Sequence, residues 1–570
     1  MIEPMTWIDY TVFVLMLICS TSIALYQGVI KSKANTVEEY LYAGRKIPLI
    51  PIILSNMAST ISSIIIVGVP REAYYYGLEM LFMPFGQIAG FACFYFFYLP
   101  VFYELKYISY FEYLERRFNN AVRLLGSAVF TISQIIYALI IMHSTCTAIT
   151  TVIPIPFYLL VTILCWLCTF YTFLGGLRGV VWSDFIQALF MYGSLATIIV
   201  LSIVHLGGLN NAVQIASEGG RLQFFNFDPS CFARFSSWTL WISGFTISLQ
   251  NICTNPAVVQ RCLTLPNYSK MKIIIFSSAA AYFTIFVACT ILGLLMYASY
   301  HDCDPLLSGQ LNNADDLLTY HVLNIGRHVP GLSGLFLAGI LSAALSSLST
   351  ILNTLSGIIM EDFIKKVIPF TITEEQNSLY LKSVVILVGL LVNGGIFSLS
   401  SSGGIMHMSV TMVSLVGGLI VFIFSFGLFI REANTKGVII GAVSGCLITL
   451  WMSLGNMWSV AAGKITYTTK IVSIEGCLAN VSDILPVNNS SMTVGSPDDT
   501  PVIFAEDVPY LYRISFNLFI LIGIIVSFSF GIFTVLCTKS EEVKNENLLI
   551  KQIRRTKPPE NIAMSTNLRF

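Results

Sequence analysis

The chain has 570 residues, of which 55% are hydrophobic and only 11% carry a charged side chain, and its mean hydropathy is +0.76. Soluble globular chains carry about 25% charged residues, so this composition excludes an ordinary soluble domain. The 31 Lys and Arg balance the 31 Asp and Glu, and a net charge of zero gives no reason to expect nucleic acid as a partner. We therefore predict an all-α polytopic protein that is embedded in the lipid bilayer.

Thirteen apolar segments are long enough to cross a bilayer as helices. They lie near residues 7–28, 48–69, 78–103, 122–153, 156–175, 184–206, 237–257, 272–300, 331–360, 381–400, 404–430, 437–458 and 513–537. The first is preceded by Glu3 and by no basic residue, so we expect a transmembrane helix there rather than a signal peptide. Thirteen spans would place the two ends of the chain on opposite sides of the membrane.

The distribution of positive charge predicts the orientation, because cytoplasmic segments of membrane proteins are enriched in Lys and Arg. With the N-terminus outside, 24 of the 31 Lys and Arg fall on the inner side and 7 on the outer side. We therefore predict an outer N-terminus and an inner C-terminus. The membrane domain should cover residues 1–540, and the charged, Pro-containing residues 541–570 should form a disordered cytoplasmic tail.

The outer loops of this topology contain sites for covalent modification. Asn480, Asn488 and Asn489 match the glycosylation acceptor motif within the 459–512 loop. The cysteines that fall in outer loops are Cys231, Cys303 and Cys477, among which one disulfide could form.

Two spans are unusually polar for membrane helices. The second contains Ser55, Asn56, Ser59, Thr60, Ser62 and Ser63, and the seventh contains Ser243, Gly244, Thr246, Ser248, Gln250, Asn251, Thr254, Asn255 and Pro256. Each is followed by four further spans, and interrupted helices in matching positions of two five-helix halves are typical of secondary transporters with inverted repeats. Two helices that line an unrelated pore, or that pack through small residues, are the alternative.

The ninth span carries a row of hydroxyl side chains. Ser342, Ser346, Ser349 and Asn353 share one helical face. Hydroxyl and carbonyl oxygens are ligands for a dehydrated hard cation, although close helix packing is the alternative reading of such residues. Glu79, Asp184 and Asp362 lie only at span ends, so the spans offer no central carboxylate for a proton relay, and we favour Na⁺ over a proton as the coupling ion.

Several long stretches resemble the sodium:solute symporter family, within the branch of the sodium/iodide, sodium-coupled monocarboxylate and sodium-dependent multivitamin transporters. They read VGVPREAYYYG (67–77), FEYLERRFNNAVRLLG (111–126), FYTFLGGLRGVVWSDFIQ (170–187), NPAVVQR (255–261) and PGLSGLFLAG (330–339). The resemblance implies a LeuT-like bundle of thirteen helices with two inverted five-helix repeats, at about 47–206 and 237–430.

The resemblance also implies the residues of a Na⁺ site between the second and ninth spans. These are the carbonyl groups of Ala58, Ile61 and Ala343 and the hydroxyl groups of Ser346 and Ser347, with Ser349 and Thr350 at positions that serve a second Na⁺ site in this branch. The chain departs from the branch at Ile65, where sodium/iodide transporters have Gln and monocarboxylate carriers have Thr nearby. It also has Pro256 and Val258 where the branch has Gln, so the solute cannot be transferred from any one member.

We predict a plasma-membrane symporter, and not an enzyme, that imports Na⁺ with a small organic anion by alternating access. The solute would be a monocarboxylate or a vitamin such as biotin or pantothenate. Its pocket is expected near Ser55, Asn56, Gln87, His143 and Ser248, where Gln87 could donate to a carboxylate or simply bridge two helices. A channel, or a transport-inactive solute sensor on the same fold, is the alternative function.

Overall fold

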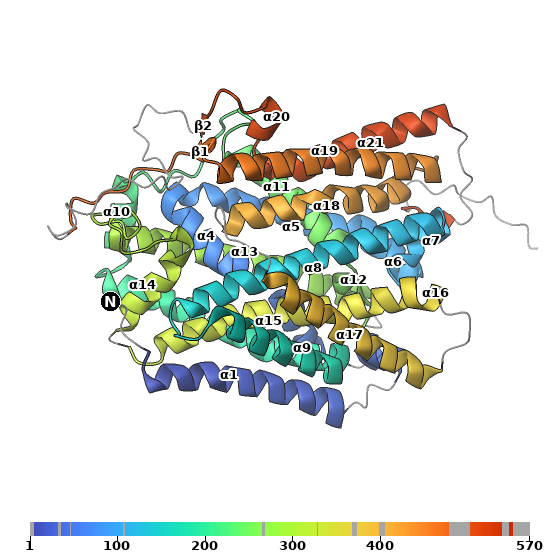
Figure 1. The fold of residues 1–570 in the computed structure, drawn as a ribbon, viewed down its shortest axis with the longest axis horizontal. Helices are drawn as coiled ribbons and strands as arrows, with labels where there is room; N and C mark the ends of the chain where they lie inside the picture. Colours follow the sequence, from blue (N-terminus) through green and yellow to red (C-terminus); the bar gives the residue numbers. More distant parts are fainter. Residues whose placement is uncertain are drawn as a thin grey trace, which may run out of the picture.

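The long helices of the protein run side by side along one axis and form a single bundle in the computed structural model (Figure 1). The structure describes residues 5–31, 36–45, 47–105, 109–264, 268–327, 329–367, 373–397, 405–477, 502–538 and 546–550. The described residues are almost entirely helical, and their one sheet pairs β1 (Ile465–Tyr467) antiparallel with β2 (Val502–Phe504). The all-α prediction is therefore confirmed.

The helices of the bundle are, in chain order, α1 (Trp7–Leu25), α3 (Leu49–Thr60), α4 (Ser63–Tyr76), α5 (Phe82–Cys93), α6 (Leu99–Leu105), α8 (Asn120–Thr150), α9 (Phe157–His205), α11 (Ser237–Ser248), α12 (Pro256–Leu263), α13 (Tyr268–Tyr300), α15 (Leu332–Ile358), α17 (Glu374–Ile396), α18 (Ile405–Phe429), α19 (Thr435–Ala461) and α21 (Phe519–Cys537).

Shorter helices connect them: α2 (Val37–Tyr42), α7 (Glu112–Arg117), α10 (Leu209–Glu218), α14 (Leu317–Gly326), α16 (Lys365–Val367) and α20 (Tyr510–Arg513). Single π-helical turns lie at η1 (Tyr26–Ile30), η4 (Phe94–Tyr98), η5 (Leu249–Cys253) and η7 (Ile359–Ile364), and 3₁₀ turns at η2 (Ala43–Arg45), η3 (Gly77–Leu81), η6 (Ala314–Asp316), η9 (Phe516–Leu518) and η10 (Glu546–Leu548).

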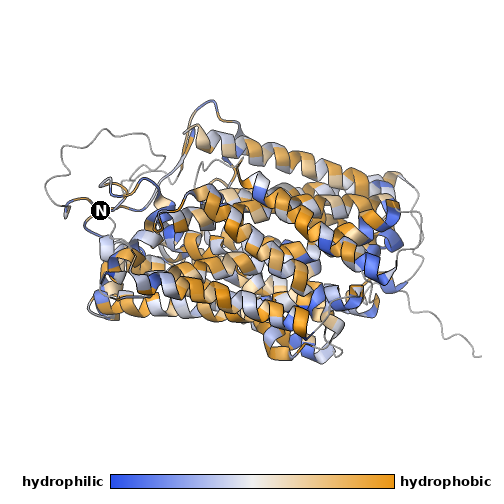
Figure 2. Ribbon diagram, turned by 60° about the horizontal axis from the view of Figure 1, so that its bottom comes forward, coloured by the Kyte–Doolittle hydropathy of each residue, from blue (hydrophilic) through white to orange (hydrophobic). Residues whose placement is uncertain are grey.

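Apolar residues cover the outer helices along their length, and hydrophilic residues gather mainly at the two ends of the bundle (Figure 2). Nine helices of the described ranges are long and apolar enough to cross a membrane, or ten if the bent pair within α18 counts as one span. Two of the nine, 43 and 49 residues long, exceed the roughly 20 residues that one crossing needs. The longer one, α9, consists of two helices that meet at Gly176 (φ 51°), so the spans predicted at 156–175 and 184–206 follow each other without a separate loop.

The two predicted interruptions are confirmed. The second span breaks between α3 and α4, where Ile61 and Ser62 have extended backbone. The seventh breaks between α11 and α12, where the π-turn η5 leads into Asn255, whose side chain accepts a hydrogen bond from the backbone N–H of Ala257 (3.0 Å). Pro256 follows at the first position of α12, where its missing N–H costs nothing.

Helix α15 is the central helix of the bundle, because 89% of its apolar window is buried. Small residues let its neighbours come close. A Cβ atom on Gly334 would lie 2.1 Å from the carbonyl oxygen of Asp9 on α1, and one on Gly339 would lie 2.0 Å from the hydroxyl of Ser194 on α9. The row of hydroxyl side chains on α15 therefore faces other helices and not lipid.

Helices α5 and α11 touch through their backbones. A Cβ atom on Gly86 would lie 1.9 Å from the carbonyl oxygen of Trp241, and one on Gly244 would lie 1.9 Å from that of Met83. Both glycines are needed for this approach, because any side chain would push the two helices apart.

The two ends of the bundle have different contents (Figure 1). The N-side end, where α1 begins, carries α10, α14 and the β-hairpin, and the C-side end, where α21 finishes, carries α7 and α16. At the N-side end a disulfide joins Cys303 and Cys477, which confirms one disulfide among the three loop cysteines, while Cys231 is free and exposed. The predicted glycosylation sites Asn480, Asn488 and Asn489 lie outside the described residues.

Part of the predicted disordered tail is ordered. Residues 546–550 lie against the bundle. The N–H of Ile550 donates to the carbonyl of Leu428 (3.3 Å), and the hydroxyl of Tyr113 donates to the carbonyl of Leu548 (3.1 Å). The apolar side chains of residues 548–550 are buried, and this burial outweighs the polar composition around them. These five residues of the predicted tail therefore pack against the bundle, and disorder elsewhere in 541–570 stays a prediction.

Candidate functional site

The break in the second span meets the serine face of α15. The hydroxyl of Ser346 donates a hydrogen bond to the carbonyl oxygen of Ala58 (2.9 Å), and both residues are completely buried. Ala58 lies in the last turn of α3, where carbonyl groups have no partner within the helix and are available to another ligand. Ile61, also completely buried, is the first extended residue after α3.

Helix α15 places the other predicted Na⁺ ligands within one turn of Ser346. Ala343 and Ser347 are both buried, and the hydroxyl of Ser347 has no hydrogen-bond partner within the described part of the chain. A buried hydroxyl without a partner costs about 1–3 kcal/mol. The donor set of hydroxyl and carbonyl oxygens, with one hydroxyl unused, fits a dehydrated hard cation.

The two residues predicted for a second Na⁺ site are engaged differently. The hydroxyl of Ser349 donates to the carbonyl of Ser346 in its own helix (3.1 Å). Thr350 accepts a hydrogen bond from Nη2 of Arg261 (2.6 Å), so its hydroxyl already contacts a positive charge.

Arg261 and Asp184 form an ion pair inside the bundle. Nη2 of Arg261 lies 3.3 Å from Oδ2 of Asp184, and the exposed fractions of the two side chains are 2% and 0%. Ser55 joins them, because its hydroxyl donates to Oδ2 of Asp184 (2.6 Å) and accepts from Nε of Arg261 (3.2 Å). The network ties together α12, α9, α3 and α15.

The sequence placed Asp184 at the end of a predicted span and gave no sign that it pairs with Arg261. The structure buries both, Asp184 in the second part of α9 and Arg261 in α12 after the break of the seventh span.

A cavity of about 110 Å³ lies between the two broken spans and has room for several water molecules. Its polar lining consists of Ser59, Thr60, Ser62, Gln87, Gln134, Tyr137, Ser248, Asn251, Asn255, Arg261, Tyr282, Thr350 and Ser409. Arg261 is the one charged residue in the described lining of this cavity. Ile65, Met83, Phe91, Ile247 and Val410 contribute to the apolar part of the wall.

Two of the five predicted solute residues line the cavity. The amide of Gln87 donates to the hydroxyl of Tyr282 (2.9 Å), and the hydroxyl of Ser248 donates to the carbonyl of Gln87 (3.2 Å). Sequence reasoning missed Tyr137 and Tyr282, which lie in segments that read as ordinary apolar helix.

The other three predicted solute residues are not in the cavity wall. Ser55 belongs to the Arg261 network, and the amide of Asn56 donates to the hydroxyl of Ser278 (2.7 Å), because the cavity faces Ser59, Thr60 and Ser62 of this span instead. His143 packs against the ring of Phe157 (centroids 5.4 Å apart), and α8 reaches the cavity through Gln134 and Tyr137 two turns earlier.

A larger hollow of about 800 Å³ lies at the N-side end of the bundle. Glu79, Arg221 and Lys470 contribute charged groups to it, and Nζ of Lys470 lies 3.8 Å from Oε1 of Glu79. Burial lowers the pKa of Lys470 from its usual value, although the nearby Glu79 opposes this shift.

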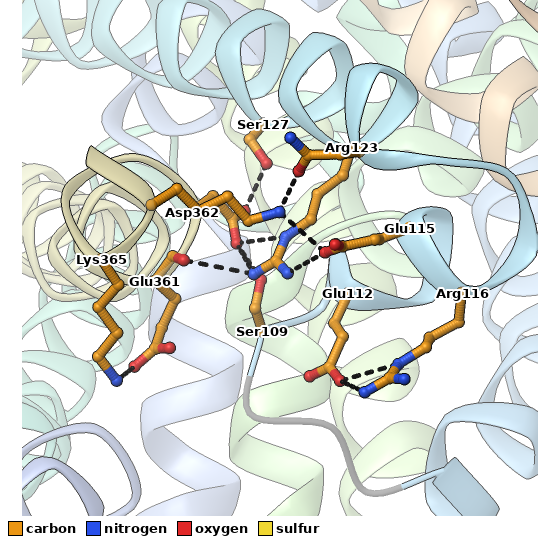
Figure 3. A network of polar contacts seen from close by, with 11 residues as sticks. Ser109, Glu112, Glu115, Arg116, Arg123, Ser127, Glu361, Asp362 and Lys365 are labelled. Atoms are coloured by element: carbon orange, nitrogen blue, oxygen red, sulfur yellow. Dashed lines mark hydrogen bonds and ion pairs between the residues drawn. The ribbon is translucent and has the colours of Figure 1, made fainter. Parts of the chain in front are cut away.

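The C-side end of α15 is anchored by a network of charged residues (Figure 3). Asp362 on η7 is fully buried and accepts hydrogen bonds from Nε of Arg123 (2.9 Å), from Ser109 (2.8 Å) and from Ser127. Nη1 of Arg123 also contacts Glu115 on α7 (2.5 Å). The helix that carries Ser346 is thereby fixed to α7 and α8.

Two broken helices around a polar cavity define the protein as a secondary transporter by architecture. Residues 40–445 match the sodium:solute symporter family. The chain is 30% identical to the human sodium-coupled monocarboxylate transporter 1, with 92% of this chain and 87% of that protein covered. It is 30% identical to the human sodium/iodide cotransporter (88% and 80% covered) and 29% identical to a putative sodium-dependent multivitamin transporter of Drosophila melanogaster (92% and 85% covered).

The fold is similar to that of a solved Na⁺-coupled sialic acid symporter, captured in a substrate-bound outward-open state. The TM-score is 0.73 at 22% sequence identity, and the match covers 94% of this chain and 99% of that one. The protein thus belongs to the sodium:solute symporter family, and Na⁺ is its co-transported ion. The relatives named above are transporters and not enzymes.

Proposed function

We propose that the protein couples the inward movement of Na⁺ to the import of a small organic anion, such as a monocarboxylate or a vitamin like biotin or pantothenate. The observation that carries the proposal is the contact of Ser346 with Ala58 at the break of the second span, next to a cavity whose charged lining residue is Arg261. The relatives are named for monocarboxylates, iodide and vitamins, which are all anions or include anions at neutral pH.

The Na⁺ ion would be held by the carbonyl oxygens of Ala58, Ile61 and Ala343 and the hydroxyls of Ser346 and Ser347. Five oxygens from two helices suit Na⁺, and the ion would draw α3 and α15 together more strongly than their present single hydrogen bond. Ser349 and Thr350 remain a weaker proposal for a second ion, because Thr350 already accepts from a guanidinium group.

The solute would enter from the N-side hollow, bind in the cavity beside Gln87 and Ser248, and leave at the C-side end. Ser55, Asn56 and His143 remain a weaker proposal for the solute site, because they do not line this cavity and contact other side chains. With one Na⁺ per singly charged anion the transfer is electroneutral and the Na⁺ concentration gradient drives the solute, whereas each further Na⁺ adds about 2.3 kcal/mol for each 100 mV of membrane potential.

The proposed topology has thirteen crossings, an outer N-terminus, an inner C-terminus and inverted repeats at about 47–206 and 237–430 within the membrane domain 1–540. It is supported by the positions of α1 and α21, which begin and finish at opposite ends of the bundle (Figure 1), and by the bias of Lys and Arg. In the plasma membrane the N-side end would face outward, and Asn480, Asn488 and Asn489 would be open to glycosylation.

A panel of radiolabelled solutes tests the function. Cells that express the protein are given lactate, nicotinate, biotin, pantothenate, iodide, choline or glucose, each with Na⁺ or with N-methyl-D-glucamine in its place. Saturable uptake of one or more anions only with Na⁺ is the expected result. Unitary currents that need no solute would instead show a channel, and solute binding without uptake or current would show a sensor.

A further inference from the structure

The guanidinium group of Arg261 is only partly used by the protein. Its Nε contacts Ser55 (3.2 Å), and its Nη2 contacts Asp184 (3.3 Å) and Thr350 (2.6 Å). Nη1 makes no hydrogen bond to any described residue, although the side chain is 98% buried. A guanidinium group has five N–H donors, and the three contacts use those of Nε and Nη2, so the two N–H groups of Nη1 are left to donate elsewhere.

The ion pair with Asp184 does not saturate Arg261. It is a single contact of 3.3 Å, and the second oxygen of Asp184, Oδ1, has no hydrogen-bond partner within the described residues. By contrast, Nη2 of Arg234 contacts both oxygens of Glu72, at 2.8 and 2.9 Å. Asp184 therefore orients and partly neutralises Arg261 without occupying its full hydrogen-bonding capacity.

The cavity is the place where the unused edge of Arg261 can meet a ligand. Arg261 and Thr350 both line it, and the tyrosines Tyr137 and Tyr282 contribute neutral hydroxyl groups to the same wall. In a buried site a guanidinium group binds a carboxylate more strongly than a neutral group does, and the free N–H groups of Nη1 can donate to it. A neutral carboxamide of the same shape offers only one acceptor oxygen.

We propose that Arg261 selects the carboxylate group of the solute through Nη1, with Asp184 and Ser55 as positioning residues. This inference rests on the proposed function. It adds to that function a residue that recognises the charge of the solute. The transporter would accept a carboxylate and reject the corresponding carboxamide. Thr350 links Arg261 to the turn of α15 that carries Ser346 and Ser347, so a bound Na⁺ would offset the negative charge that the solute adds.

The test compares each carboxylate with its carboxamide, lactate with lactamide and nicotinate with nicotinamide, in Na⁺-dependent uptake. Wild type should prefer the carboxylate by at least tenfold. R261Q should lose at least tenfold of carboxylate uptake at equal surface expression, and R261K should keep the preference with a raised KM because it keeps the charge. The control R117Q also removes a buried Arg, one that donates to the carbonyls of Gly427 and Ile430, and should leave the ratio of the two solutes unchanged.

The double variant R261Q/D184N separates recognition from a purely structural role. It removes both charges, so the bundle again holds no uncompensated charge. Surface expression without carboxylate preference supports recognition by Arg261, whereas carboxylate uptake at the wild-type level would overturn it. A variant that fails to reach the surface leaves R261K as the decisive case, and loss of the preference in R261K would overturn the inference.

Failure of the inference can be told apart from failure of the proposed function. Na⁺-dependent uptake of a neutral solute, or equal uptake of acid and amide by wild type, would refute the role of Arg261 and leave symport intact. The absence of any Na⁺-dependent uptake or current in wild type would refute the symport proposal itself.

Discussion

The hydroxyl of Ser346 on α15 donates to the carbonyl oxygen of Ala58 on α3, across 2.9 Å and at the point where α3 stops. This contact joins a continuous helix to a broken one. The carbonyl is available only because the helix ends there, so the break in the chain and the position of the serine depend on each other.

Replacing Ser346 and Ser347 by Ala should raise the Na⁺ concentration for half-maximal uptake by about tenfold or more, which corresponds to about 1.4 kcal/mol of lost binding. The reason is that two of five proposed oxygen ligands disappear. The matched control is S356A on the same helix, whose hydroxyl donates only to the carbonyl of Asn353 (2.7 Å). Unchanged Na⁺ activation of the double variant, with normal surface expression, would contradict the assignment.

D362N should destabilise the purified protein, because it leaves Arg123 with only the partly exposed Glu115 as a carboxylate partner. Breaking a buried ion pair typically costs about 3–5 kcal/mol. We expect the melting temperature to fall by about 5 °C or more, measured by the fluorescence of a thiol-reactive dye in detergent. The neighbouring variant E361Q removes only the partly exposed ion pair of Glu361 with Lys365. It should lower the melting temperature by about 1 °C or less. Equal shifts in the two variants would mean that Asp362 does not anchor α15.

Acid should destabilise the N-side end of the bundle through His321 on α14. Burial, with a smaller contribution from His205, lowers the pKa of His321 to about 3, and its Nε2 lies 3.0 Å from the hydroxyl of Ser202. The folded state therefore binds fewer protons than the unfolded state below pH 6.5, so stability falls as the pH falls from 6.5 towards 3.

The loss should be at most about 1.4 kcal/mol per pH unit. Melting temperatures between pH 7.5 and 5 should decrease less steeply for H321Q than for wild type, since the amide does not acquire a charge. Parallel curves for the two proteins would show that His321 is not the group responsible.

Cysteine labelling in intact cells tests the orientation and the disulfide together. A membrane-impermeant maleimide should label the free, exposed Cys231 at once, and Cys303 and Cys477 only after reduction. C231S should abolish the labelling before reduction. Cys537, exposed at the other end of the bundle, is the matched control and should react only in permeabilised cells. Labelling of Cys537 in intact cells would reverse the proposed topology.

The broken helices could be predicted from sequence because their signals are local. Polar residues with Asn255 and Pro256 inside an apolar run are visible without knowledge of any other segment, and the helical spacing of Ser342, Ser346 and Ser349 fixes one face of α15. The structure adds only which neighbour that face meets.

The Arg261 network could not be predicted in the same way. Asp184 and Arg261 are 77 residues apart, and each looks like an ordinary charge at the end of a span until the helices are assembled. His143 does not line the cavity for a related reason. The sequence shows that a residue lies on a membrane helix, but which face of α8 meets the cavity depends on its packing against α9 and α18. The ordered residues 546–550 owe their structure to a distant surface on α7 and α18.

The backbone contact of α5 with α11 through Gly86 and Gly244 bears on how the protein can move. Two helices whose backbones are in direct contact have no layer of side chains that could rearrange between them. We therefore expect α5 and α11 to move together as one rigid body. Gln87 lies on α5 and Ser248 on α11, so the hydrogen bond between them would be kept during such a movement. The part of the cavity wall formed by α5 and α11 would then keep its structure during transport. The cavity would open to either side of the membrane through movement of the other helices relative to this pair.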